Sequence, residues 1–326
     1  MSRSLPLGIS VAPTPVTGYY IIITDDFGNI FYLNETEEGT YVTDSATFRG
    51  MIGRIYTLHI SSNRGINNLI YQSYPVEMKP VPPIDSIYYE KIEIPVTVSW
   101  IQNPEGCQIF LDTHDPSNKC KYYRWEYTDT WEFRIPYSVP NNTCWTSSTS
   151  DKINIANTSS LSESKITKYP LSFVSNNSDR LSVKYSILVN QYSLNEDEYA
   201  YWDKLQRITQ EVGSLYDIIP SSVPSNVYCI NNPGEQVLGY FSVSAATSKR
   251  IFIRDHFYGL AKPYSYDACI ADTVFDGAYI PNLGSSVWVL IDNFIPRYQV
   301  ITYTRGCADC TTRGTTSRPA YWNDVK

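Results

Sequence analysis

Residues 19–33 read YYIIITDDFGNIFYL, and this stretch predicts a β-hairpin. Two runs rich in β-branched and aromatic residues, 19–24 and 30–33, flank the turn-forming residues 25–29. Similar short runs follow at 41–43, 54–60 and 69–74. Strands of this length and spacing predict that residues 1–79 form a small β-sandwich of the immunoglobulin or transthyretin type, whose first strand is missing.

A proline-rich segment, KPVPP at 79–83, predicts the boundary between two domains. Three of its five residues lack the backbone N–H that a strand needs, and each residue before a proline is held extended. A chain of 326 residues also exceeds the usual length of a single domain. Residues 84–326 are therefore expected to form a larger β-sandwich-like domain, with a hairpin over 108–127 and later strands at 183–189, 236–243, 250–253 and 288–291.

One amphipathic helix is predicted in the larger domain, near residues 195–212. Residues 193–196 read SLNE, which is a capping-box pattern. A stripe of apolar side chains at three- and four-residue spacing follows, made of Tyr199, Trp202, Leu205, Ile208 and Val212. Gly213 then supplies a stop signal. The stripe favours core packing against a sheet over contact with a cofactor, and the protein as a whole is expected to be mainly β.

Charge and cysteine content limit the partners and the compartment. A net charge of -7 and a pI near 5.1 provide no basic surface for nucleic acid. The longest apolar runs, at 19–23 and 287–291, are far shorter than the roughly 18 to 20 residues of a membrane-spanning helix. Seven cysteines in a chain with 28 tyrosines favour disulfides and an oxidising compartment. The first residues carry no export signal, so we expect that the natural N-terminal segment is missing.

The sequence holds no complete catalytic motif, so no enzymatic activity, cofactor or metal is expected. His114-Asp115 and Arg254-Asp255-His256 are the acid–base clusters, and each lies in or beside a predicted turn. No local pattern supplies a nucleophile, base and oxyanion donors together. Cys307 and Cys310 form a C-x-x-C pair, which fits a redox site, half of a zinc site or two structural disulfides. A second C-x-x-C is lacking, which favours disulfides.

An aromatic stretch at 122–127 is the candidate contact surface for a peptide or glycan ligand. Its rings belong to Tyr122, Tyr123, Trp125 and Tyr127. Aromatic rings provide large contact areas at a low entropic cost. In a strand, however, alternate residues face inward, so at least half of these rings are expected in the core.

Several segments together resemble the domain-of-unknown-function 4249 family of Bacteroidota outer-membrane lipoproteins. They are PVTG (15–18), ITDDFGN (23–29), FRG (48–50), GRIYTL (53–58), VPPIDS (81–86), YYRW (122–125), CW (144–145), YSI (185–187), QYSL (191–194), VLGYF (237–241), CADC (307–310), GT (314–315) and PAYW (319–322). No single motif is specific, and their order along the chain carries the resemblance.

The resemblance implies location more than mechanism. Family members begin with a lipoprotein signal and a lipidated cysteine, which this sequence lacks, and they are associated with TonB-dependent transporters. The resemblance therefore implies a non-enzymatic surface lipoprotein that captures a ligand or acts as a transporter lid. The alternatives are a stand-alone adhesion or carbohydrate-binding module and, less favoured, a hydrolase.

The C-terminal tail is expected to be tethered by disulfides. Cross-links that close long loops stabilise most, so Cys307 and Cys310 should bond to cysteines earlier in the larger domain rather than to each other. The resemblance favours Cys144 and Cys269 as those partners, with Cys107, Cys120 and Cys229 as the less favoured alternatives.

Overall fold

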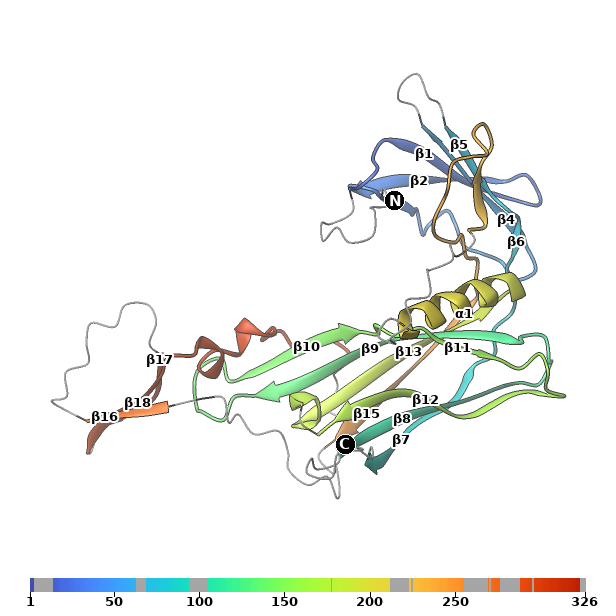
Figure 1. Ribbon diagram of the computed structural model, residues 1–326. Coiled ribbons are helices and arrows are strands. Elements are labelled where there is room, and N and C mark those ends of the chain that lie inside the picture. The colour runs from blue at the N-terminus through green and yellow to red at the C-terminus, as the bar shows by residue number, and fades with distance from the viewer. Residues whose placement is uncertain are drawn as a thin grey trace.

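The computed structural model describes residues 1–2, 14–62, 69–93, 105–176, 178–211, 223, 225–254, 269, 271–275, 288–294 and 296–322. These residues form several antiparallel sheets and one α-helix (Figure 1). The predicted mainly-β fold class is therefore confirmed. The prediction of a missing first strand falls in part on residues 3–13, which lie outside the described residues, and stays a prediction.

The N-terminal sheet contains the predicted hairpin as two of its neighbouring strands. Its strand order is β14-β5-β4-β1-β2-β3, with β6 paired to β4. The turn between β1 and β2 is fixed by Asp25, whose carboxylate accepts hydrogen bonds from the backbone N–H groups of Phe27 and Asn29, both at 2.9 Å. Gly28 follows with φ +83°, a conformation that glycine adopts without strain. The strands are β1 (Tyr19–Asp25), β2 (Ile30–Glu37), β3 (Thr40–Thr43), β4 (Ile55–Ser62), β5 (Ile70–Ser73), β6 (Val76–Glu77) and β14 (Val227–Cys229).

Strand β14 comes from the sequence range assigned to the larger domain. It pairs with β5 in the register Val227↔Ser73. The boundary at 79–83 therefore does not separate the two sheets completely, because the chain returns to the first sheet after the helix. The prediction of a strand at 236–243 is wrong. Asn226 instead holds this segment as a loop, since its side-chain amide pairs with both the N–H and the carbonyl of Phe241, at 2.7 and 2.8 Å.

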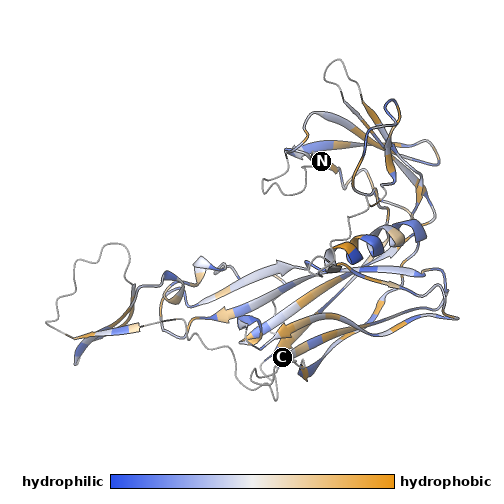
Figure 2. Cartoon of the chain, in the orientation of Figure 1, coloured by the Kyte–Doolittle hydropathy of each residue, from blue (hydrophilic) through white to orange (hydrophobic). Residues whose placement is uncertain are grey.

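The larger unit is a sandwich of two sheets. One has the order β10-β9-β13-β15 with β11 paired to β9, and the other has the order β12-β8-β7. The predicted hairpin over 108–127 is therefore wrong, because its two strands, β8 and β9, lie in different sheets. Apolar side chains from both sheets form one core, in which Ile109, Leu111, Trp125 and Ile187 are fully buried. Figure 2 shows apolar residues distributed along these strands. The strands are β7 (Ile84–Glu93), β8 (Glu105–Asp115), β9 (Tyr122–Arg134), β10 (Thr143–Thr149), β11 (Asn154–Asn157), β12 (Ser164–Ser175), β13 (Lys184–Leu194) and β15 (Ala246–Arg254).

A buried glutamine joins the two sheets and the segment before them. Gln191 on β13 is fully buried, and its side-chain oxygen accepts a hydrogen bond from the Trp125 indole N–H at 2.8 Å. Its amide nitrogen donates to the Pro82 carbonyl at 2.8 Å and to the Thr113 hydroxyl at 3.1 Å. The amide therefore fixes β9, β8 and the proline-rich segment relative to one another.

Helix α1 (Glu196–Glu211) confirms the predicted helix and lies over β9 and β11 (Figure 1). Acidic residues occupy its first turn, where the helix dipole favours negative charge. Glu198 is fully buried, and its carboxylate accepts a hydrogen bond from the Ser242 hydroxyl. Burial raises the pKa of Glu198. Val212 and Gly213 lie outside the described residues.

A small C-terminal sheet lies at one end of the molecule in Figure 1. Its strand order is β16-β18-β17. Three 3-10 helices complete the described elements. The bounds are β16 (Ala271–Phe275), β17 (Trp288–Phe294), β18 (Arg297–Thr302), η1 (Asp179–Leu181), η2 (Arg305–Cys307) and η3 (Cys310–Thr312).

Substituting Gln191→Leu is expected to lower the free energy of unfolding by about 3 kcal/mol, because it leaves the Trp125 N–H and the Pro82 carbonyl buried without partners. Urea-induced unfolding measures the change. The control is Gln206→Leu, which removes one hydrogen bond to the Ile153 carbonyl and is expected to cost about 1 kcal/mol or less. Equal stability of the two variants would contradict the role given to Gln191.

Candidate functional site

The predicted aromatic contact residues all lie on β9. They are Tyr122, Tyr123, Trp125 and Tyr127. Tyr123 and Trp125 are fully buried, with stacked rings 5.9 Å apart, so their assignment as ligand contacts is wrong. The cause is the strand alternation, which points both rings into the core. Tyr122 is half-buried against Tyr199 of α1, and the Tyr127 hydroxyl accepts a hydrogen bond from Ser172 at 3.0 Å. These four residues do not form an exposed platform.

Two disulfides tether the C-terminal part of the chain. Cys144 on β10 is bonded to Cys310, and Cys269 is bonded to Cys307. The C-x-x-C cysteines thus bond to the two partners that the resemblance favours, and not to each other. Their sulfurs are occupied in these bonds, so this spacing presents no pair of thiolates to zinc or to a redox partner.

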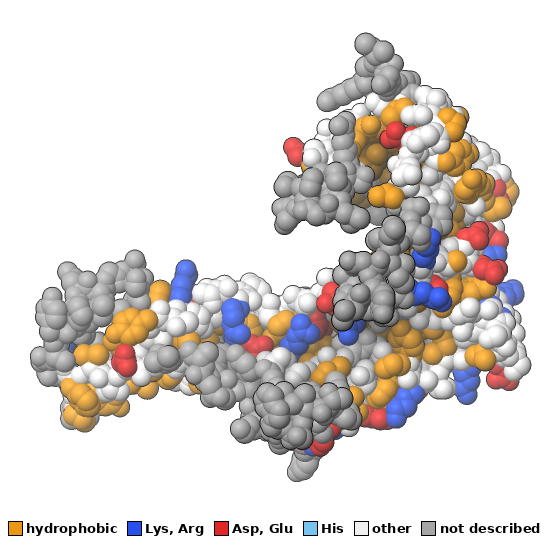
Figure 3. Space-filling view, viewed as in Figure 1, with side chains coloured by type: hydrophobic (Ala, Val, Ile, Leu, Met, Phe, Trp, Pro, Cys, Tyr) orange, Lys and Arg blue, Asp and Glu red, His pale blue; other side chains and the backbone are white. Residues whose placement is uncertain are grey.

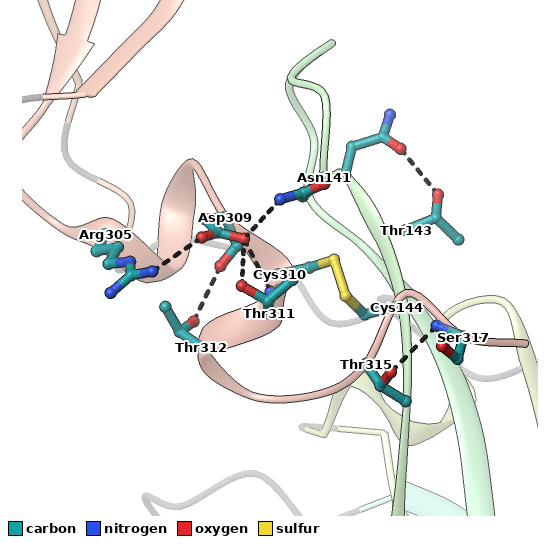
Figure 4. The surroundings of a disulfide bond; sticks show 11 residues. Asn141, Thr143, Cys144, Arg305, Asp309, Cys310, Thr311, Thr312, Thr315 and Ser317 are labelled. Atoms are coloured by element: carbon teal, nitrogen blue, oxygen red, sulfur yellow. Dashed lines mark hydrogen bonds and ion pairs between the residues drawn. A yellow bond between two sulfur atoms is a disulfide. The ribbon is translucent and has the colours of Figure 1, made fainter.

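Polar contacts around Cys310 hold the tail against β10 (Figure 4). The Asp309 carboxylate accepts hydrogen bonds from the Thr311 backbone N–H at 3.1 Å and from the Thr311 hydroxyl at 2.6 Å. The Thr311 hydrogen bonds lower the pKa of Asp309 to about 2. The backbones of Trp145 and Thr315 exchange two hydrogen bonds of 2.9 Å, which extend the edge of β10 by one bridge. The tail is therefore a structural element of the sandwich.

The free cysteines are Cys107, Cys120 and Cys229, and all three are buried. Burial raises the pKa of Cys107 to about 11 and that of Cys120 to about 12. Thiols with raised pKa values are poor nucleophiles at neutral pH. These two side chains act as core residues rather than reactive groups.

Replacing Cys144 and Cys310 by alanine is expected to lower the free energy of unfolding by about 5 kcal/mol, because the bond closes a separation of 166 residues. Guanidinium-induced unfolding measures the loss, and peptide mapping under non-reducing conditions checks the pairing. The control is Cys107→Ala, which truncates a free buried thiol and is expected to cost about 1 kcal/mol. A fragment joining Cys307 to Cys310 would show that the pairing is wrong.

A charged cleft of about 390 Å³ lies on the outer face of the β12-β8-β7 sheet. On β8, Leu111 and Thr113 are buried in the core. The alternate residues Asp112 and His114 therefore point outward. The cleft is lined by Asp85, Asp112, His114, Glu163, Lys165, Ile166 and Thr167. Three strands that are distant in sequence thus place carboxylates, an imidazole and an ammonium group around one hollow.

An acid–base pair lies at the cleft. His114 Nδ1 is 2.6 Å from Asp85 Oδ2, and the two side chains are 50% and 35% exposed. In the described part of the chain, no hydroxyl or thiol is hydrogen-bonded to His114. The pair therefore orients an imidazole toward solvent without an adjacent nucleophile among those residues. His256, the other histidine of the predicted acid–base clusters, lies outside the described residues.

A β-bulge beside the cleft fixes the position of Asp112. The register of β12 against β8 shifts between Ile166 and Tyr169, and Lys168 within the bulge has φ +55°. Its backbone N–H donates to Asp112 at 2.6 Å, and the Ser86 hydroxyl donates to the same carboxylate at 2.8 Å. A left-handed conformation of a non-glycine residue costs about 1–3 kcal/mol, and such strained residues are enriched at functional sites. The bulge therefore supports the cleft as the candidate site.

The sequence could have indicated part of this site. Asp112 and His114 are two residues apart, which places them on one face of β8, although the sequence predicted a turn at His114. Asp85, Glu163 and Lys165 join them through strand pairings that no local pattern reveals. Among the described residues, no cluster of His, Cys, Asp and Glu has the geometry to hold a metal ion. No described helix is long and apolar enough to cross a membrane.

Comparison with known proteins identifies a family. No curated protein matches the chain, and no solved structure matches it. A family model described as Domain of unknown function (DUF4249) matches residues 1–250 of 326. The match extends from the N-terminal sheet into β15 of the sandwich and ends before Cys269, Cys307 and Cys310. Because the match covers well over half of the sequence, the chain belongs to the DUF4249 family.

Proposed function

We propose that this chain is a non-enzymatic binding protein of the outer-membrane surface of a Bacteroidota bacterium. There it captures or presents a ligand beside a TonB-dependent transporter, or acts as the transporter's lid, while held by a lipid anchor. The observation that carries the binding role is the charged cleft on β7, β8 and β12. Among the described residues, no hydroxyl or thiol is hydrogen-bonded to the His114 imidazole. This arrangement supports binding rather than hydrolysis, because a hydrolase needs an activated nucleophile.

The composition of the cleft favours a short peptide as the ligand. Asp85, Asp112 and Glu163 provide negative charge for an ammonium or guanidinium group, and Lys165 provides positive charge for a carboxylate. A zwitterion with both kinds of group matches this arrangement better than a neutral sugar. Glu163 and Lys165 are both exposed, so they meet a ligand without prior rearrangement of the fold.

The surface location is supported by the disulfides and by the family. Two cross-links in one chain are characteristic of oxidising compartments. Membership of the DUF4249 family agrees with the sequence resemblance. That resemblance is the basis for proposing an outer-membrane location and a transporter as the partner.

Peptide binding is expected to depend on the charges of the cleft. The immobilised chain is incubated with a tryptic digest of casein, and retained peptides are quantified by mass spectrometry. The double variant Glu163→Gln with Lys165→Gln is expected to retain roughly fivefold less peptide, because two solvent-exposed charge contacts are lost.

The matched control is Glu38→Gln with Lys152→Gln, which removes the same charges from exposed positions outside the cleft and is expected to bind like the wild type. Equal retention by both double variants, or no retention by the wild type, would refute the role of the cleft.

In intact cells, the tagged protein with its natural leader is expected to be cleaved by added protease and to cross-link to a TonB-dependent transporter. Mass spectrometry of the cross-linked outer-membrane fraction identifies the partner. A periplasmic lipoprotein serves as the control for cell integrity. Protection from protease, or cross-links that include no such transporter, would contradict the proposed location and partner.

A further inference from the structure

The N-terminal sheet has one buried face and one face open to solvent. Ile21, Ile23, Tyr56 and Ile60 point to the buried face. The opposite face, here called the open face, runs across β14, β5, β4, β1, β2 and β3. Its members are Tyr20, Ile22, Thr24, Ile30, Tyr32, Asn34, Val42, Thr57, His59, Ser61, Ile70, Gln72 and Tyr228, all exposed or half-buried. Figure 3 shows hydrophobic side chains at the surface of this unit.

Five of these residues form a continuous row across five strands. Strand pairing places Tyr228 opposite Gln72, Gln72 opposite His59, His59 opposite Ile22 and Ile22 opposite Tyr32. Four strand spacings of about 4.8 Å give the row a length of about 19 Å. The row is thus long enough for an oligosaccharide or another extended ligand.

Tyrosine pairs lie at both ends of the row. Tyr32 contacts Tyr20 with ring centroids 6.0 Å apart, and Tyr228 contacts Tyr74 at 5.1 Å. The four residues are 38–60% exposed. Tyrosine combines an apolar ring with a hydroxyl group and is enriched at binding surfaces for this reason. Exposed rings at both ends of one row are unusual for a surface that stays in contact with water alone.

The named members of the open face include no Asp, Glu, Lys or Arg, so they carry no charge under neutral conditions. At the margin of the same face, Glu77 of β6 lies opposite Ile55 and is paired with Lys79. His59 is hydrogen-bonded to the Thr24 hydroxyl at 2.9 Å, and burial lowers the pKa of its imidazole, which favours the neutral form. The polar groups that remain are hydroxyls, amides and a neutral imidazole, which donate and accept hydrogen bonds without charge.

We propose that the open face binds a neutral glycan. The C–H faces of sugar rings pack on the exposed tyrosines, while sugar hydroxyls pair with Gln72, Ser61 and Asn34. A charged ligand would lose hydration here without gaining a counter-charge. The open face belongs to a different sheet from the cleft, so glycan binding goes beyond the proposed function and needs neither the peptide nor the transporter.

Affinity electrophoresis of the full chain tests the proposal. Native gels contain starch, xyloglucan or mannan as neutral probes, or polygalacturonate as a charged probe. At least one neutral polysaccharide is expected to retard the wild type, and polygalacturonate is not. The double variant Tyr32→Ala with Tyr228→Ala is expected to bind about tenfold more weakly. The control Tyr89→Ala with Tyr303→Ala removes two exposed tyrosines elsewhere and is expected to be retarded like the wild type.

Thermal unfolding of both double variants checks that the fold is kept. Failure of all three neutral polysaccharides to retard the wild type would overturn the proposal. So would equal retardation of the Tyr32/Tyr228 variant and the wild type. Self-association of the wild type that the same variant abolishes, measured by analytical ultracentrifugation, would instead identify the open face as an interface between copies.

Discussion

The architecture depends on one buried side-chain amide whose nitrogen and oxygen are both hydrogen-bonded. Gln191 uses both ends of its side chain, so that an indole N–H, a hydroxyl and a backbone carbonyl are all paired around it. A buried polar group without a partner costs about 1–3 kcal/mol, which makes such a network intolerant of any shift between its members. The separation of the two sheets and the path of the proline-rich segment are therefore set together.

This anchoring continues along β13 toward the helix. The Ser193 hydroxyl donates to the Lys79 carbonyl at 2.7 Å, and the Asn195 amide donates to the Glu77 carbonyl at 3.0 Å. Strand β14 then returns to the first sheet beside β5. The N-terminal sheet is thus connected to the sandwich by side-chain hydrogen bonds and by a strand, and not by a simple linker. A sequence boundary drawn at prolines does not reveal such a return.

Local features of the fold could be predicted from the sequence, and long-range ones could not. The hairpin around Asp25 and the helix after Asn195 follow from turn residues and periodicity within a few positions, although Ser193 of the predicted capping box lies in β13. Strand alternation explains why Tyr123 and Trp125 are buried together. The sequence alone does not say which alternate set of side chains faces inward. The cleft was missed because its charges meet only through pairings among three strands. The cleft and the return of β14 depend on contacts between distant segments, whereas the strand predicted at 236–243 and the hairpin predicted over 108–127 are local predictions that fail.

The charged cleft and the open face differ most in the charge of the groups that they expose to solvent. The cleft holds carboxylates and an ammonium group, whose attraction for a ligand is weakened by salt. The open face holds rings, hydroxyls and amides, whose contacts are not screened by ions. The cleft offers counter-charges to a zwitterion, whereas the named members of the open face offer it none. Under the two proposals, a single chain would hold two chemically distinct ligands on two different sheets.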